Sequence, residues 1–162
     1  MSAPPVTEDD LVRFVYHEAR LIDEKRFAEW YELFTDDGRY WVPLTRGQPD
    51  GENHTSLLYE DKLLLRVRIE RLRNPNSFSQ QQPSFCQHVM QAPSIESADA
   101  TRATWVTRTP FVYAESQLDT QILLAGVSWL HLVLIEGELR IRLKKVELLN
   151  CDAALPSIQL FP

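Results

Sequence analysis

The sequence predicts an α+β fold, in which N-terminal helices pack on a strongly curved antiparallel sheet formed by the second half of the chain. Two patterns indicate this. Apolar residues recur at helical spacing between Leu11 and Ile22, and four runs of β-forming residues occupy the chain after residue 83. Helices and strands segregated in this way are typical of α+β domains. With 162 residues, we expect a single domain over 1–162.

The first helix has a clear predicted start. Thr7 is a good N-cap residue, and Asp10 lies three residues later, as in a variant of the capping box. Leu11, Val15 and Ile22 then fall on one helical face. This pattern predicts an amphipathic helix that buries one side.

Further elements follow in the first half. Residues 26–34 favour a short helix, and the Thr-Asp-Asp-Gly sequence at 35–38 predicts a turn in which glycine has a positive φ. Residues 39–42 then form a short predicted strand. Residues 47–54 are polar, and we expect them to form a loop. We expect residues 56–73 to form a third helix, whose C-terminal part is basic. Residues 74–83 are expected to form another loop.

The second half consists of long β-forming runs. They span residues 84–95, 101–115, 120–135 and 138–149, and the connections are short and carry turn residues. Short connections force neighbouring strands to be antiparallel. Because the runs are long for strands, we expect a curved sheet whose concave face is covered by the helices.

The last run contains a change of side-chain parity that supports curvature. Its alternating apolar residues are Leu139, Ile141, Leu143, Val146 and Leu148. The first three occupy odd positions and the last two even positions. A β-bulge at Lys144-Lys145 would produce this change.

Composition excludes several classes of function. The net charge of −6 argues against nucleic acid or an anionic membrane as the main partner. The apolar runs are too short to span a bilayer. The two cysteines, Cys86 and Cys151, lie far apart, so we expect free thiols in a cytoplasmic protein.

Motifs for cofactors and metals are missing from the sequence. It has no C-x-x-C, no H-E-x-x-H, no glycine-rich phosphate loop and no G-x-S-x-G. We therefore expect no cofactor and no metal in this chain. A triad of two histidines and a carboxylate assembled in space stays open as a minor alternative.

A general acid–base site is the strongest catalytic candidate. It would use Asp61, His88 and Tyr40 in an apolar pocket beneath the helices. The commoner explanation is structural: the aromatic residues and His88 belong to the core, and Asp61 is solvated or caps a loop. We favour the structural explanation.

The C-terminal tail is unusually apolar. No charged residue occurs from Ala153 to Pro162, although chain ends are usually polar unless something holds them. We expect Ile158, Leu160 and Phe161 to be buried, at or beside a subunit contact.

Three segments carry a resemblance to a known family. They are WYELFTDDGRYWVPL (30–44), LLYEDKLLLRVRIERLR (57–73) and KKVELLNCDAALPSIQLFP (144–162). Together they resemble the small β subunit of bacterial aromatic-ring-hydroxylating dioxygenases, and the tail is the most specific of them. The implied fold is the cone shared by nuclear transport factor, scytalone dehydratase and ketosteroid isomerase.

The resemblance implies a function in an assembly. In this family the α subunit holds a Rieske [2Fe–2S] cluster and a mononuclear iron, and it dihydroxylates an aromatic ring with O2 and electrons from NADH. The β subunit is mainly structural, holds neither metal, and assembles as three α plus three β, with a trimer of β subunits. A benzoate-like acid is one candidate substrate. The alternative is a stand-alone isomerase or dehydratase of the cone fold that uses an Asp/His pair.

Overall fold

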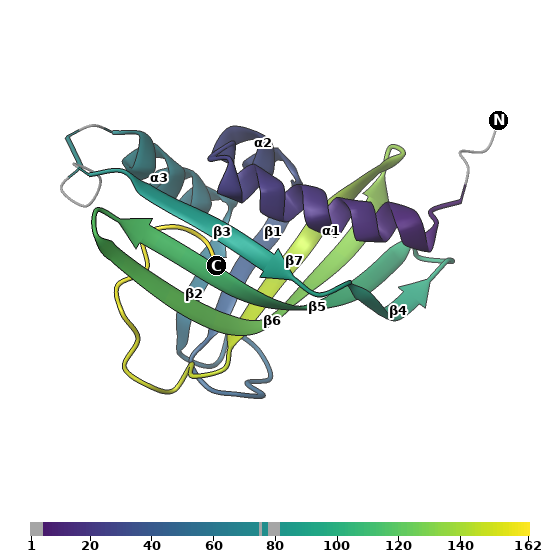
Figure 1. The fold of residues 1–162 in the computed structure, drawn as a ribbon. Helices are drawn as coiled ribbons and strands as arrows, with labels where there is room; N and C mark the ends of the chain where they lie inside the picture. The colour runs from purple at the N-terminus through teal and green to yellow at the C-terminus, as the bar shows by residue number, and fades with distance from the viewer. Residues whose placement is uncertain (1–4, 75, 78–81) are drawn as a thin grey trace.

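The computed structural model describes residues 5–74, 76, 77 and 82–162. The helices are α1 (Glu8–Asp23), α2 (Phe27–Glu32) and α3 (Lys62–Arg73), and the strands are β1 (Phe34–Pro43), β2 (Ser56–Asp61), β3 (Ser84–Met90), β4 (Ser94–Asp99), β5 (Thr104–Gln117), β6 (Thr120–Ile135) and β7 (Glu138–Leu148). Figure 1 shows α1 and α2 lying across one face of a curved sheet. The predicted α+β architecture is confirmed.

The strands form a mixed sheet of order β2-β1-β7-β6-β5-β3, and β4 also pairs with β5. The pairs joined by short turns, β5–β6 and β6–β7, are antiparallel as predicted. The prediction of a wholly antiparallel sheet was wrong for β1 and β7, which run parallel. These two strands are far apart in the chain, so no tight turn dictates their relative direction.

The start of α1 is as the sequence predicts. The Asp10 backbone N–H donates to the Thr7 hydroxyl at 3.2 Å, and the Thr7 backbone N–H donates to the Asp10 carboxylate at 2.8 Å. Leu11, Val15 and Ile22 are buried on the inner face of this helix. Among the described residues, no helix is long and apolar enough to cross a bilayer.

The predicted turn at residues 35–38 was wrong, because these residues belong to β1. Phe34 is opposite Ile141 of β7, whereas Arg39 is opposite Leu143. The pairing of β1 with β7 is therefore interrupted between Phe34 and Arg39. Gly38 is not among the residues with positive φ. A Cβ at Gly38 would lie 2.8 Å from the Thr35 carbonyl oxygen, so close approach of the backbone requires glycine here.

The predicted helix over 56–73 was wrong in its first part. Residues Ser56–Asp61 form β2, which pairs antiparallel with β1 and places Tyr59 opposite Trp41. The helix α3 begins only after Asp61, whose carboxylate accepts the Leu64 backbone N–H at 2.9 Å. Pairing with β1 therefore overrides the leucine pattern up to the capping residue.

The run over 84–95 was predicted as a single strand, but it divides into β3 and β4. Both pair with β5, β3 along its second half and β4 along its first half. The interruption contains Pro93, which has no N–H to donate to a strand ladder. Part of the predicted loop over 74–83 lies outside the described residues.

The bulge in β7 lies earlier than predicted. His131 of β6 is opposite Leu143, and Leu132 is opposite Ile141, so Arg142 is the extra residue. The prediction of a bulge at Lys144-Lys145 was wrong. Lys144 faces inward and is only 2 % exposed. Its charge does not exclude it from the core, because a carboxylate lies beside it.

Candidate functional site

Aromatic side chains fill the space between the concave face of the sheet and the helices, which we call the cone interior. The ring centroid of Trp30 lies 4.6 Å from that of Phe161 and 5.1 Å from that of Phe34. Tyr40 contacts Phe161 edge to face at 5.8 Å. All of these side chains are buried. The tail residue Phe161 therefore occupies the centre of the cone interior.

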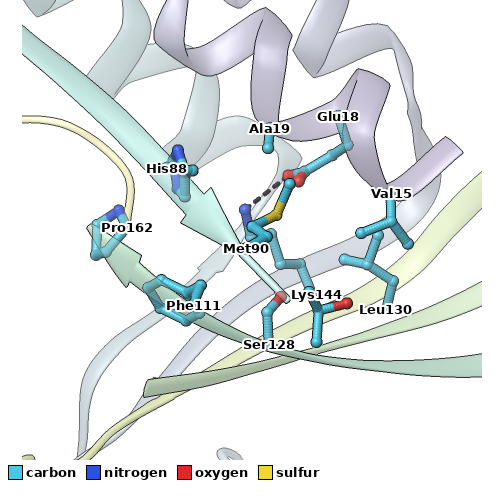
Figure 2. Close-up of a pocket in the computed structure, with 11 residues that line it drawn as sticks. Val15, Glu18, Ala19, His88, Met90, Phe111, Ser128, Leu130, Lys144 and Pro162 are labelled. Carbon is cyan, nitrogen blue, oxygen red and sulfur yellow. Dashed lines mark hydrogen bonds and ion pairs between the residues drawn. The ribbon is translucent and has the colours of Figure 1, made fainter. Parts of the chain in front are cut away.

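A cavity of about 10 Å³ remains beside this aromatic cluster. Its walls come from α1, β3, β5, β6, β7 and the end of the tail, as Figure 2 shows. Such a volume is about that needed for one water molecule. A small aromatic substrate would require displacement of the packed side chains.

A buried ion pair lies at the wall of this cavity. Lys144 Nζ of β7 is 2.6 Å from Glu18 Oε1 of α1 (Figure 2), and Trp30 Nε1–H donates to the same oxygen at 2.8 Å. Both charged side chains are at most 5 % exposed. The sequence reasoning missed this pair, although Glu18 stands on the apolar face of α1, three residues after Val15. The pair joins α1 to the sheet and leaves neither charge buried without a partner.

The predicted acid–base residues are not brought together. Asp61 caps α3 with a side chain that is 45 % exposed. His88 is on β3, at the opposite end of the strand order from β2. The Tyr40 hydroxyl donates to the Pro162 carbonyl oxygen at 2.8 Å, and burial raises the pKa of this tyrosine well above its usual value. The placement of Asp61 agrees with a structural role.

His88 has a different carboxylate partner. Its Nδ1 lies 2.6 Å from Oδ1 of Asp23, the last residue of α1, and its backbone N–H donates to Oδ2 at 3.1 Å. Cys86 faces the same way on β3, with Sγ 3.6 Å from Asp23 Oδ1. Burial, and then the Asp23 charge, raise the pKa of the Cys86 thiol to about 12. No sequence pattern pointed to Asp23, which lies more than sixty positions before its partners.

Glu115 of β5 anchors the tail. Its carboxylate accepts the backbone N–H groups of Gln159 at 2.9 Å and Leu160 at 2.8 Å, and the Tyr113 hydroxyl at 2.7 Å. The side chains of Leu160 and Phe161 are 2 % and 0 % exposed, so the predicted burial of these two is confirmed. They are buried by this chain's own core.

A subunit contact at Ile158, Leu160 and Phe161 stays a prediction. Ile158 is only half-buried and therefore retains surface for such a contact. Leu160 and Phe161 would contribute to such a contact indirectly, by fixing the path of the tail.

The convex face of the sheet carries a row of aromatic and cationic side chains. Strand pairing aligns Tyr59, Trp41, Lys145, Trp129 and Arg108 across β2, β1, β7, β6 and β5. Lys145 Nζ lies 4.9 Å from the ring centroids of both tryptophans. On the same face, the exposed apolar residues include Phe85, Val89, Val112 and Leu123. A sheet face of this composition is a candidate contact surface.

The helices on a curved sheet, the filled interior and the anchored tail define a cone-shaped α+β protein. A candidate scytalone dehydratase of Novosphingobium aromaticivorans has this fold, with a TM-score of 0.63 at 11% identity over 85% of this chain and 80% of that chain. The similarity is in the fold alone.

The family follows from the sequence comparisons. The family model described as "Ring hydroxylating beta subunit" matches residues 17–153, so the chain belongs to the β subunits of ring-hydroxylating dioxygenases. The small oxygenase component of the p-cumate 2,3-dioxygenase system of Pseudomonas putida is 29% identical over 93% of this chain and 83% of that protein. The β subunit of benzoate 1,2-dioxygenase from Burkholderia mallei shares the fold, with a TM-score of 0.77 at 23% identity over 98% of this chain and 99% of that one. The resemblance found in the three sequence segments is confirmed.

Proposed function

We propose that this chain is the non-catalytic, structural β subunit of a multicomponent aromatic-ring dioxygenase. The observation that carries the proposal is the cone interior, which is filled by Trp30, Phe34, Tyr40 and Phe161 in a chain of this family. A filled interior supports a scaffolding role, because the cavity left beside these rings is only about 10 Å³.

The chemistry would reside in a Rieske-type α subunit. That subunit would carry the [2Fe–2S] cluster and the mononuclear iron, and it would use O2 and electrons derived from NADH. We expect three α and three β subunits in the cytoplasm, with a trimer of β subunits. The exposed apolar side chains on the convex face of the sheet support the expectation of protein partners.

The substrate we propose is an aromatic carboxylate of the benzoate type. The relatives described above are named for p-cumate and benzoate, which both fit this class. The α subunit, rather than this chain, would select among such acids.

The stand-alone isomerase or dehydratase is the weaker candidate. In its proposed Asp/His pair, Asp61 is an exposed helix cap, and the cavity that His88 lines has room for about one water molecule. Neither feature favours turnover of a substrate in this chain alone.

Co-expression with the Rieske-type α subunit encoded beside this chain would test the proposal. We expect a single complex with the mass of three α plus three β, iron that depends on the α subunit, and ring dihydroxylation only with the α subunit present. The control is each chain expressed alone. A failure to associate, or turnover of an aromatic substrate by this chain without a partner, would contradict the proposal.

A further inference from the structure

Three side chains with metal-binding atoms converge where the end of α1 meets β3. Asp23 ends the helix, and Cys86 and His88 are two residues apart on the strand. One ligand atom from each lies within 4.8 Å of the other two. We propose that Asp23, Cys86 and His88 bind a zinc-like divalent metal ion that fastens α1 to the edge of the sheet.

The donor atoms are almost completely removed from solvent. The side chains of Asp23 and His88 are 11 % and 5 % exposed, and Cys86 is 8 % exposed. A buried carboxylate is costly unless a positive charge or hydrogen bonds compensate it. A divalent cation coordinated at this position would supply that charge.

The carboxylate of Asp23 is oriented so that one oxygen faces the other two donors. Oδ2 accepts the Gln87 side-chain N–H at 3.0 Å and the His88 backbone N–H at 3.1 Å. Oδ1 lies 2.6 Å from His88 Nδ1 and 3.6 Å from Cys86 Sγ, and it shares the His88 backbone N–H at 3.2 Å. Outer-shell hydrogen bonds of this kind fix a metal-ligating carboxylate in its binding orientation.

His88 faces Asp23 with Nδ1, which leaves Nε2 as the ring nitrogen that would carry the proton if a metal were bound. Its Nε2 is buried and has no hydrogen-bond partner among the described residues. A histidine that binds a metal through Nδ1 carries its proton on Nε2 and donates it to a neighbouring acceptor. His88 also lines the cavity of about 10 Å³, which has room for one water molecule.

The combination of donors selects the class of ion. One sulfur, one imidazole nitrogen and one carboxylate oxygen suit zinc and its near neighbours, whereas magnesium and calcium favour oxygen ligands alone. Three protein ligands leave a fourth tetrahedral position for water. In the absence of an ion, hydrogen bonds from His88 and Cys86 to Asp23 hold the same residues together.

The role inferred for the ion is structural and separate from the proposed dioxygenase function. It would add a connection between α1 and β3, which is the last strand of the main sheet order. The iron centres expected in the α subunit are of a different kind, so the metal contents of the two chains can be measured independently.

Cobalt(II) is the probe for the test, because a thiolate bound to it gives a charge-transfer absorption band. The metal-free 162-residue chain would be titrated with Co²⁺ and, in parallel, with Zn²⁺ during thermal unfolding. We expect one equivalent to bind with a thiolate band, and Zn²⁺ to raise the Tm. Cys86→Ser should abolish the band, whereas Cys151→Ser, which alters the other buried thiol, should retain it.

A second variant keeps the test decisive if Cys86→Ser fails to fold. Gln87→Ala removes a hydrogen bond to Asp23 Oδ2 without touching a ligand atom, and it should weaken Co²⁺ binding by about tenfold or more. Binding without a thiolate band, a band that disappears only in Cys151→Ser, or no saturable binding would overturn the inference. None of these results bears on association with the α subunit.

Discussion

At the scale of single residues, the core of this protein accepts charged groups wherever another group compensates them. Glu18 and Lys144 pair with each other, and Glu115 accepts two backbone N–H groups of the tail. Each is at most 4 % exposed. A local sequence pattern predicts that such charged residues lie on the surface. It contains no information about a partner that lies far away in the chain. These residues connect α1, the sheet and the tail.

Lys144→Met tests the buried ion pair. The substitution keeps the volume and leaves the Glu18 carboxylate without its cation, so we expect a loss of about 3–5 kcal/mol in the free energy of unfolding. Urea unfolding measures it. The double variant Glu18→Gln/Lys144→Met should recover much of the loss, because no isolated charge remains. Equal losses in the single and double variants would contradict this account.

Glu115→Gln tests the anchor of the tail. An amide has one acceptor oxygen where the carboxylate has two, so one of the backbone N–H groups of Gln159 and Leu160 loses its partner. We expect a loss of about 1–3 kcal/mol and faster hydrogen exchange at these two amides. Glu96→Gln is the matched control, since the Glu96 side chain is 46 % exposed and its ion-pair partner among the described residues, Arg108, lies 3.7 Å away. Unchanged exchange in Glu115→Gln would show that other contacts hold the tail.

At the scale of elements, a local capping signal set the start of α1, whereas packing set the strands. The capping box begins α1 where the sequence predicts, and Asp61 begins α3. Residues 56–61 were predicted to be helical but form a strand, because they pair with an edge of β1. The bulge at Arg142 then turns Lys144 inward, toward Glu18. The cap of α1 could be predicted from neighbouring residues, whereas the cap of α3, the strand and the bulge depended on distant ones.

Asp10→Asn tests the capping box through its pH dependence. The Thr7 hydroxyl and backbone N–H lower the pKa of Asp10 below 3.8 in the folded protein. A lowered pKa stabilises the fold at pH values above 3.8, and that contribution is lost as the pH falls through the folded value. The wild type should therefore exceed Asp10→Asn in stability at neutral pH, and the difference should shrink in acid. A difference that does not change with pH would contradict an ionised cap.

At the scale of the whole molecule, the tail completes the core. Phe161 contacts Trp30, Tyr40 and Phe27, although it is separated from all of them by most of the chain. The cone interior is therefore closed by the segment that carries Phe161. The convex face, in contrast, keeps apolar side chains exposed, which is the arrangement expected of a subunit that functions by association.

Phe161→Ala tests the role of the tail as the core's central packing element. Removing this buried ring should cost about 3–5 kcal/mol and open an apolar cavity in the cone interior. Thermal unfolding measures the loss, and added benzene should restore part of it by filling the cavity. The control is Leu149→Ala, because Leu149 is exposed. A loss as small as that of the control would show that Phe161 is not central to the core.

The sequence by itself determined the α+β class, the capped first helix, the long strands after residue 100 and the family, because these depend on local periodicity, capping and short motifs. Only the tertiary structure decided that Asp61 is a cap, that Asp23 is the partner of His88, and that Lys144 is buried with Glu18. Each of these outcomes depends on residues brought together from distant parts of the chain. The fold determines which charged groups lie beside a partner. A charged group can be buried where such a partner compensates its charge.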